Sequence, residues 1–250
     1  MTHPLFYSPD VTDVKAGAVV YLDAASSGHA IRSQRLSAAD RVLVSDGAGT
    51  LAQGIIESAD PQRTGIYLET VAVQPGPAMK INLVQALAKG DRDLMAVEMA
   101  TEIGVDAVTP WQAQRSIVRV RPERAAKTQH KWQAKLRTAA QQARRARIPE
   151  LRPLVQDSDI APLHVPTAGE HVIVLHEDGQ TSLEDALATV PDTAGLLHLV
   201  VGPEGGVSGD EVTAVAQAGG SIVQIGTNVM RASTAGPVAI ALLNQLLNRW

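Results

Sequence analysis

The sequence predicts an α/β protein in which a small N-terminal β domain precedes a larger domain of alternating strands and helices. Three observations lead to this prediction. Short runs rich in Val, Ile, Leu and Tyr, separated by turn residues, occupy residues 19–73. After residue 78, strand-like and helix-like segments alternate. Glycine-rich turns then follow apolar strands in the last third of the chain, as is common in α/β proteins.

The first domain is predicted to be a small β-barrel or sandwich. Its expected strands lie at residues 19–22, 42–45, 54–57 and 66–73. Asp46-Gly47-Ala48-Gly49 has the composition of a hairpin turn, and Gln74-Pro75-Gly76-Pro77 reads as a linker. We therefore expect one domain at residues 1–74 and a second at residues 78–250.

In the second domain we expect strands at residues 78–83, 107–110, 115–120, 171–175, 196–201 and 221–225, and a helix at residues 91–103. Thr128 is a suitable N-cap for a further helix that stops before Pro149. Ser208 and Glu211 have the spacing of a capping box, which would start a helix directly after a glycine-rich turn. Gly236-Pro237 is expected to open the last helix.

Composition excludes several classes of function. The 250 residues include no cysteine, which rules out disulfides, a thiolate nucleophile and cysteine-type metal sites. The seven histidines form no close ligand pair, so we expect no metal. The longest uncharged stretch is too polar to span a bilayer, and the N-terminus lacks the pattern of a secretory signal. We expect no membrane contact and a cytoplasmic location.

Charge is distributed unevenly along the chain. The formal net charge is −4, but residues 115–152 contain twelve Lys or Arg and only two acids. A run of this kind is often a solvated helix surface. Here the imbalance favours binding to a polyanion.

Two glycine-rich segments suggest a cofactor pocket. Gly202-Pro203-Glu204-Gly205-Gly206 and the segment from Ile225 to Ala235 each follow a predicted strand, and Leu175-His176-Glu177 follows a third. Ligands in open α/β sheets bind at the carboxyl ends of strands. The spacing fits neither the dinucleotide fingerprint nor a phosphate loop. An ordinary strand-to-helix turn is the alternative interpretation of the first segment.

Several further motifs occur along the chain. They are Glu102-Ile103-Gly104-Val105, Pro110, Arg115-Ser116, residues 141–149, residues 202–206, and Met230-Arg231-Ala232-Ser233-Thr234-Ala235. Together they resemble the ribosomal RNA small subunit methyltransferase E family of the SPOUT superfamily, whose members methylate N3 of a uracil. The match covers nearly the whole chain. Ala232 and Ser233 depart from the family's usual pattern, and Ser233 stands where the family carries a carboxylate.

The resemblance implies a PUA-like, RNA-binding β-barrel followed by a SPOUT α/β domain with a deep trefoil knot at about residues 171–250. It also implies a homodimer, S-adenosylmethionine as methyl donor, and a decoding-region uridine of 16S rRNA in the small ribosomal subunit as substrate. The cofactor-binding residues that it implies are Leu175, His176, Glu177, Gly202, Pro203, Glu204, Gly205, Gly206, Ile225, Gly226, Met230, Arg231, Ser233, Thr234 and Ala235.

Arg231 is the candidate catalytic residue. Uracil N3 loses a proton during methylation, and a guanidinium can stabilise the resulting negative charge. An ion pair between Arg231 and Glu204 is the alternative role. No side chain is assigned as the base. The expected RNA contacts are Arg35, Arg115, Lys131, Arg144 and Arg147.

Two other functions remain open from the sequence. A SPOUT ribose 2′-O-methyltransferase acting on another RNA would use the same cofactor loops. A non-catalytic ribosome-assembly factor would keep the fold without turnover, and the departures at Ala232 and Ser233 are the sequence reason to consider it.

Overall fold

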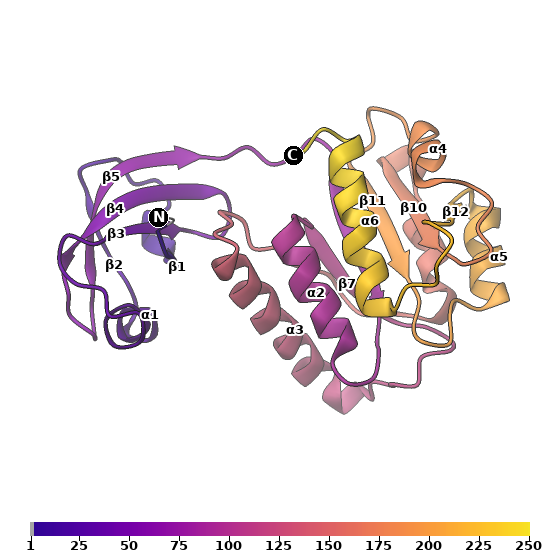
Figure 1. Cartoon of the computed structure of the whole chain (residues 1–250), viewed down its shortest axis with the longest axis horizontal. Helices are drawn as coiled ribbons and strands as arrows, with labels where there is room; N and C mark the ends of the chain where they lie inside the picture. Colours follow the sequence, from indigo (N-terminus) through magenta and orange to yellow (C-terminus); the bar gives the residue numbers. More distant parts are fainter. Residues whose placement is uncertain (1–2) are drawn as a thin grey trace. The chain divides into compact units, whose positions relative to one another are not determined.

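The computed structural model describes residues 3–250, and the chain divides into two compact units. The first unit contains the residues up to Gly76 together with Arg137–Ile148. The second unit contains Pro77–Leu136 and Pro149–Trp250. Each unit is built around a β-sheet of its own (Figure 1).

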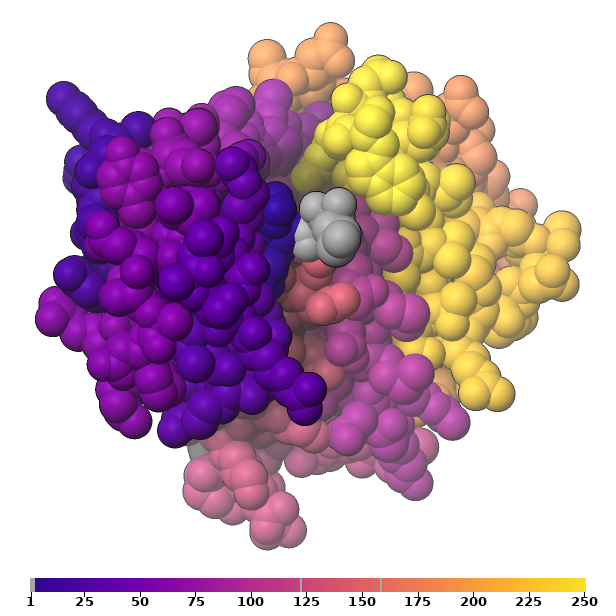
Figure 2. Space-filling model, turned by 60° about the vertical axis from the view of Figure 1, so that its left-hand side comes forward, coloured from indigo at the N-terminus to yellow at the C-terminus, as the bar shows by residue number. Residues whose placement is uncertain are grey.

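The first unit is a five-stranded sheet with the order β1-β3-β4-β5-β2. Its strands are β1 (Leu5–Tyr7), β2 (Val19–Tyr21), β3 (Arg41–Ser45), β4 (Thr50–Ser58) and β5 (Gly65–Val73). Strand β1 pairs with β3 in parallel, and the other pairs are antiparallel. Three short helical segments complete the unit: η1 (Pro9–Val11), α1 (Ala24–Gly28) and the π-helical turn η2 (His29–Ser33). In Figure 2 the indigo and purple residues of this unit form one continuous surface.

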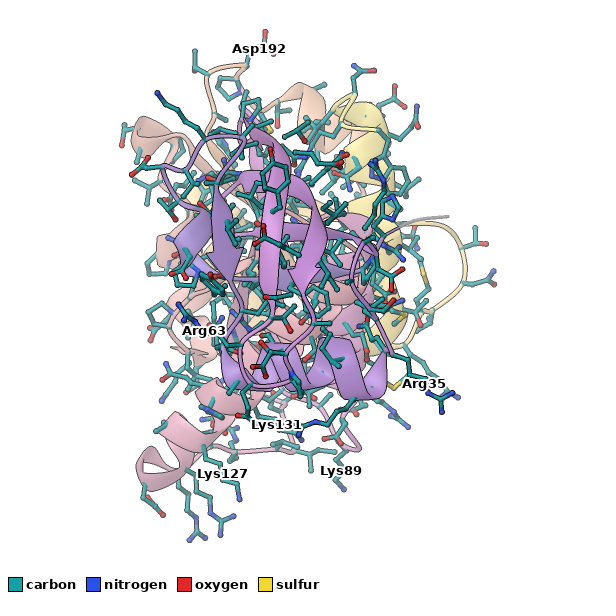
Figure 3. The ribbon with its side chains drawn as sticks, turned by 90° about the vertical axis from the view of Figure 1, so that its left-hand side faces the viewer. Arg35, Arg63, Lys89, Lys127, Lys131 and Asp192 are labelled. Carbon is teal, nitrogen blue, oxygen red and sulfur yellow. The ribbon has the colours of Figure 1, made fainter. Side chains whose placement is uncertain are left out.

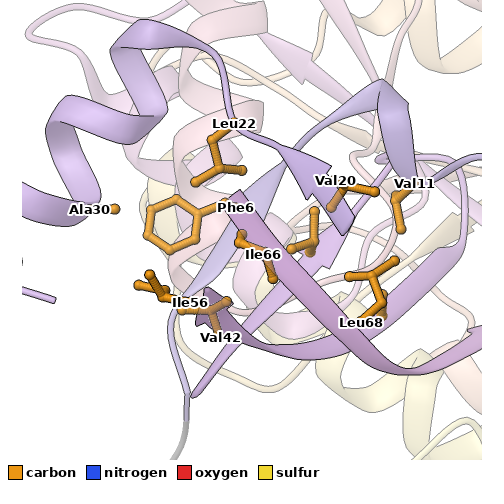
Figure 4. Close-up of a cluster of buried hydrophobic side chains, with 11 residues drawn as sticks. Phe6, Val11, Val20, Leu22, Ala30, Val42, Ile56, Ile66 and Leu68 are labelled. Carbon is orange, nitrogen blue, oxygen red and sulfur yellow. The ribbon is translucent and has the colours of Figure 1, made fainter. Parts of the chain in front are cut away.

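Four predicted strands are present in this sheet, and the turn at residues 46–49 connects β3 to β4 as expected. The prediction missed β1, whose three residues are too few to show a periodicity. Phe6 of that strand is fully buried and lies in the core that Figure 4 shows, with Val20, Ile56 and Ile66. The core closes because alternate side chains of the strands point to one face of the sheet.

Residues 137–148 belong to the first unit although 60 residues of the second unit precede them in sequence. Ala140 packs against Leu5 and Tyr7. The hydroxyl of Tyr7 donates to the carbonyl of Arg145 at 2.7 Å, and that of Ser45 donates to Ala146 at 2.8 Å. The predicted division at residues 74–78 therefore assigns this segment to the wrong unit, because its contacts are with residues distant in sequence.

The second unit is a parallel sheet of seven strands. They are β6 (Lys80–Ala86), β7 (Ala107–Gln112), β8 (Glu150–Leu151), β9 (Val155–Gln156), β10 (Glu170–Leu175), β11 (Leu196–Val201) and β12 (Ser221–Val223). The order is β12-β10-β11-β6-β7-β8, and β9 also pairs with β7. All of these pairs are parallel. Each connection must therefore cross over, and helices occupy both faces of the sheet.

The helices of the second unit lie on opposite faces of its sheet. Those that lie wholly within the unit are α2 (Arg92–Ile103), α4 (Leu183–Ala188), α5 (Gly209–Ala218) and α6 (Ala232–Leu246), with the 3-10 segments η3 (Asp157–Leu163) and η4 (Pro166–Ala168). Helix α6 packs on α2, β6 and β11, whereas α5 packs on β10, β12 and η3 (Figure 1). A Cβ at Gly236 would lie 3.0 Å from Leu83, so this glycine lets α6 approach the sheet closely.

A polar network is buried within this sheet. The amide of Asn82 donates to Thr109 at 2.9 Å and lies 2.9 Å from Nδ1 of His198, whose Nε2 is 3.1 Å from Glu170. Burial lowers the pKa of His198, although Glu170 opposes that effect. The network joins β6, β7, β10 and β11 through side chains as well as through the backbone.

Three predicted elements differ from the structure. Residues 115–120, all within the described chain, form no strand; there, Val120 donates its N–H to the side chain of Gln112 instead of to a neighbouring strand. Helix α3 (Pro122–Gln142) begins before Thr128, because proline is tolerated in a first turn. Helix α6 begins at Ala232, so Pro237 lies inside it and not at its start.

Other predicted elements are present. The helix expected at residues 91–103 is α2, and the capping box of Ser208 and Glu211 starts α5. The structure contains no helix within residues 3–250 that is long and apolar enough to cross a membrane.

Arg147 is predicted to stabilise the first unit. Its guanidinium donates to the carbonyls of Ala48 and, at 2.6 Å, of Gln74. Arg147→Ala removes both bonds and should lower the free energy of unfolding by about 1–3 kcal/mol, measured by urea denaturation. Lys15→Ala, at an exposed site of the same unit, should change it by less than about 0.5 kcal/mol. Equal effects of the two substitutions would contradict this role.

Candidate functional site

A cleft of about 540 Å³ opens at the carboxyl ends of β10, β11 and β12. Three chain segments that leave these strands form most of its wall: residues 175–177, 201–207 and 224–232. Arg92, Arg115 and Ala235 complete it. The three strands are adjacent and parallel, so their ends lie at one edge of the sheet. The volume is that of a small-molecule site.

Glycines determine the path of the segment after β11. A Cβ at Gly202 would lie 2.9 Å from the Val207 side chain and 3.1 Å from its backbone nitrogen. Gly206 has a φ of +73°, and Gly226 in the segment after β12 has a φ of +72°. These are backbone conformations that other residues rarely adopt. The glycines therefore let bare main chain form the wall of the cleft.

Glu204 joins two of the loops at this edge of the sheet. Its Oε1 accepts from the Arg92 guanidinium at 3.2 Å and from the backbone N–H of Lys89 at 3.2 Å. The carboxylate therefore holds the start of α2 against the segment after β11. The ion pair between Glu204 and Arg231, considered as an alternative, is absent from the described residues, because Arg92 takes that position.

Glu211 joins the same segment to a third loop. Its side chain is 1% exposed. One carboxylate oxygen accepts from the N–H of Ser208 at 2.8 Å and the other from the N–H of Gln114 at 2.7 Å. The first bond is half of the predicted capping box. The second was not predicted, since it connects residues 97 positions apart.

Arg115 contacts the segment after β11, residues 201–207, which we call the glycine segment. Its Nη1 donates to the carbonyl of Gly205 at 3.1 Å, and a Cβ at Gly205 would lie 3.2 Å from the Cβ of Arg115. The arginine side chain thus lines the cleft and occupies the carbonyl of Gly205.

The segment after β10 is held against the segment after β12. His176 donates its N–H to the carbonyl of Val223 at 2.9 Å, and the Gln224 amide donates to the carbonyl of Glu177 at 2.7 Å. Asp178 donates its N–H to Nδ1 of His176 at 3.1 Å. The neutral ring therefore carries its proton on Nε2.

The cleft brings together most of the predicted cofactor-binding residues. All of them line it except Ser233, which is buried in α6, and Thr234, which is exposed. The run from Thr227 to Val229 also lines the cleft, within the segment from Ile225 to Ala235 that the sequence indicated. Arg92 and Gln224 line it as well and were not predicted. No local sequence pattern predicts that Arg92 lines the cleft, because its place there depends on an ion pair with Glu204, which is distant in sequence.

Near the cleft, Asp93 is the buried carboxyl of the first turn of α2. Burial raises the pKa of Asp93, although the backbone N–H groups of Leu94 and Ala88 and the charge of Lys131 oppose that rise.

The residues predicted to contact RNA have different environments in the structure. Arg35 is exposed and projects from the ribbon in Figure 3. The ammonium of Lys131 is 2.7 Å from Asp91. Arg144 donates from Nε to the carbonyl of His3 at 2.8 Å, and Arg147 binds the carbonyls described above. Arg115 is the member of this set that lines the cleft.

In the part of the chain that the structure describes, no group of three His, Cys, Asp or Glu side chains is arranged to hold a metal ion.

Comparisons with known proteins agree with this architecture. The family model for the RNA methyltransferase domain matches residues 75–244. The ribosomal RNA small subunit methyltransferase E of Mycobacterium bovis is 36% identical over 258 residues, covering 100% of this chain and 94% of the relative. The enzyme of the same name from Bacillus subtilis is 23% identical over 221 residues, covering 86% of each chain.

Solved structures share the fold. That of the ribosomal RNA small subunit methyltransferase E from Neisseria gonorrhoeae, bound to S-adenosyl methionine, has a TM-score of 0.83 at 24% identity and covers 98% of both chains. The same values hold for the methyltransferase Lpg2936 of Legionella pneumophila, in complex with SAM. The similarity extends over both units.

Gly202→Ala should impair ligand binding in the cleft. The added Cβ displaces Val207 or the glycine segment, so we expect at least about tenfold weaker binding. The titrant for calorimetry is S-adenosylmethionine, the molecule in both solved relatives.

Gly209→Ala is the matched control. A Cβ at Gly209 would have no described atom within 4 Å, and the residue begins α5. Its affinity should equal that of the unchanged protein. If Gly202→Ala bound the titrant equally well, the glycine segment would not be the ligand-contacting wall.

Proposed function

The chain belongs to the ribosomal RNA small subunit methyltransferase E family, and on that premise we propose that it methylates N3 of a specific uridine in 16S rRNA, with S-adenosylmethionine as donor. It is a SAM-dependent rRNA methyltransferase. The main support is the cleft of bare backbone at the carboxyl edge of a parallel sheet, in a chain that aligns over its full length with named members of the family.

The residues of the cleft fit S-adenosylmethionine. Main-chain groups of the segments after β11 and β12 can hydrogen-bond a polar ligand, because glycines leave them uncovered. Leu175, Val201 and Ile225 offer apolar contacts, and Glu177 and Glu204 supply negative charge on the wall. When bound, the cofactor supplies an electrophilic methyl group on a sulfonium that leaves as a neutral thioether. The protein therefore has to orient the two reactants.

Arg231 supports N3 methylation by its position. It is exposed at the end of the segment after β12 and lines the cleft. Among the residues that the structure describes, no hydrogen bond or ion pair occupies its guanidinium. Arg92 and Arg115, by contrast, are bound to Glu204 and Gly205. Arg231 is thus available to a uracil oxygen that gains charge when N3 loses its proton.

The proposal also covers the fold family of each of the two units. The first unit would be a PUA-like β-barrel that binds RNA, and the second unit a SPOUT domain with its trefoil knot at about residues 171–250. The five-stranded sheet of the first unit supports the first assignment. The position of β10 between β11 and β12 supports the second, because the cleft segments leave neighbouring strands.

We assign the RNA contacts to Arg35, Arg115, Lys131, Arg144 and Arg147. Exposure of Arg35 and Lys131 supports contact with phosphates. Arg144 and Arg147 would contact RNA while bound to carbonyls, through the N–H groups that these bonds leave. The substrate would be the small ribosomal subunit in the cytoplasm.

The function is tested with small ribosomal subunits that lack the modification and methyl-labelled S-adenosylmethionine. An N3-methyl group blocks Watson–Crick pairing, so reverse transcription should stop at one new position, a uridine. Label without a stop would indicate a ribose 2′-O-methyltransferase and would contradict the proposed acceptor atom. Absence of label despite cofactor binding would contradict methylation of this substrate.

The same assay tests Arg231. Arg231→Ala should lower kcat by about 100-fold or more while cofactor affinity stays within about twofold, as expected for a group that stabilises developing charge. Arg231→Lys should restore part of the loss, because it keeps the charge. A wild-type rate for Arg231→Ala with normal cofactor binding would exclude the catalytic role.

A homodimer is the proposed assembly. Val238, Leu242 and Leu246 lie four residues apart on one side of α6 and are 36%, 45% and 37% exposed. The sequence pattern predicts that Val238, Leu242 and Leu246 are buried, and the described chain does not cover them. A second copy would remove this apolar stripe from water.

Leu242→Glu should dissociate the dimer, because it places a charge within the stripe. The measurement is sedimentation velocity of the full chain, with Gln217→Glu as control. Gln217 is exposed on α5, a helix that packs on β10 and β12 and carries no residue of the stripe. A monomeric wild-type chain, or an unchanged dimer in Leu242→Glu, would contradict the proposed interface.

A further inference from the structure

Residues 113–121, the platform segment, connect β7 to α3 without regular secondary structure but are held at many points. Gln114 donates its N–H to Glu211 at 2.7 Å, and Val120 donates its N–H to Gln112 at 2.7 Å. Arg119 donates to the carbonyl of Gln114 at 2.6 Å. The hydroxyl of Ser116 donates to the carbonyl of Leu87 at 3.4 Å. The segment is therefore ordered by bonds from residues on several elements.

Despite this anchoring, the platform segment exposes Ile117. Its relative exposure is 59%, whereas Ser116 beside it is 5% exposed. Single exposed aliphatic residues are common on protein surfaces. Ile117 differs because Arg115, Arg119 and Arg121 alternate with the aliphatic residues of the same segment, and all three arginines are exposed. The segment thus presents an apolar side chain among cations, of which Arg119 also lies 3.5 Å from the carboxylate of Asp157.

The platform segment borders the cleft. Arg115, two residues before Ile117, lines the cleft and donates to Gly205. Glu211 binds both Gln114 and Ser208, the N-cap of α5 that directly follows the glycine segment. The position of the platform segment is therefore fixed to the cofactor wall by two independent contacts.

Methylation of a uridine at N3 places several requirements on the protein surface beside the cleft, and the platform segment meets them. N3 lies on the Watson–Crick edge, so the base must be unpaired and drawn out of its stack before it can reach a cofactor. The neighbouring bases lose a stacking partner, and proteins that unstack bases often insert an aliphatic side chain there. The flanking phosphates require cations. An ordered backbone lets these groups act without a further ordering cost.

We propose that Ile117 is a positioning residue for the acceptor RNA: it packs against the bases next to the target nucleotide, while the arginines of the platform segment bind the adjoining phosphates. This inference rests on the proposed function, because it assumes a base that is methylated in the cleft. It adds the surface over which the single-stranded RNA approaches.

The test compares Ile117→Ala with wild type on small ribosomal subunits that lack the modification. Loss of the aliphatic contact should raise KM for the subunit about five- to tenfold, with kcat and S-adenosylmethionine affinity within about twofold. Ile117→Leu should restore the wild-type KM, because it keeps the apolar surface. Val165→Ala is the matched control: Val165 is 37% exposed in the same unit and away from the platform segment.

An unchanged KM for Ile117→Ala would overturn the inference, as would an equal rise in KM for Val165→Ala. Subunit binding is also measured by filter retention without cofactor. If wild type labels an atom other than N3, the proposed function fails, yet weaker subunit binding by Ile117→Ala would still support the platform. If wild type produces the N3 stop and Ile117→Ala binds and turns over normally, only the platform inference fails.

Discussion

The parallel pairing of β10 with both β11 and β12 is the constraint on which the cleft depends. Leu175 lies in register with Val201 on one side and with Val223 on the other. The three neighbouring strands therefore end at the same level of the sheet, although 45 residues separate the end of β10 from the start of β12. Backbone hydrogen bonds of the sheet hold these exits in place, so the loops need few contacts of their own to stay near each other.

Two carboxylates then connect the loops around the cleft. Glu204 binds Arg92 and the N–H of Lys89, and Glu211 binds the N–H groups of Ser208 and Gln114. Charge-assisted bonds to backbone N–H groups are stronger than neutral ones and leave a buried carboxylate satisfied. In this way the loops after β6, β7 and β11 are joined by side chains from a single stretch of sequence. The wall facing the ligand remains backbone, and Arg231 remains available for chemistry.

The basic run of residues 115–152 does not act as one surface. Arg144 and Arg147 donate to carbonyls within the first unit, Lys131 pairs with Asp91, and Arg115 donates to the carbonyl of Gly205. The number of charges in the sequence predicts a basic region. Each guanidinium forms directional hydrogen bonds, however, so side chains of equal charge have different partners in the fold. Lys127 is exposed and extends into solvent in Figure 3, where it adds to the positive field.

Sequence alone determined the α/β class, the glycine segments and the capping box, because periodicity, φ preference and N-cap chemistry are local properties. The family motifs also indicated most residues of the cleft. Only the tertiary structure decided the partner of Glu204, the second bond of Glu211 and the place of residues 137–148 in the first unit. It also decided that residues 115–120 form an anchored loop and no strand. These outcomes depend on contacts between residues that are far apart in the chain. Such contacts form only when the chain folds, so no local sequence pattern predicts them.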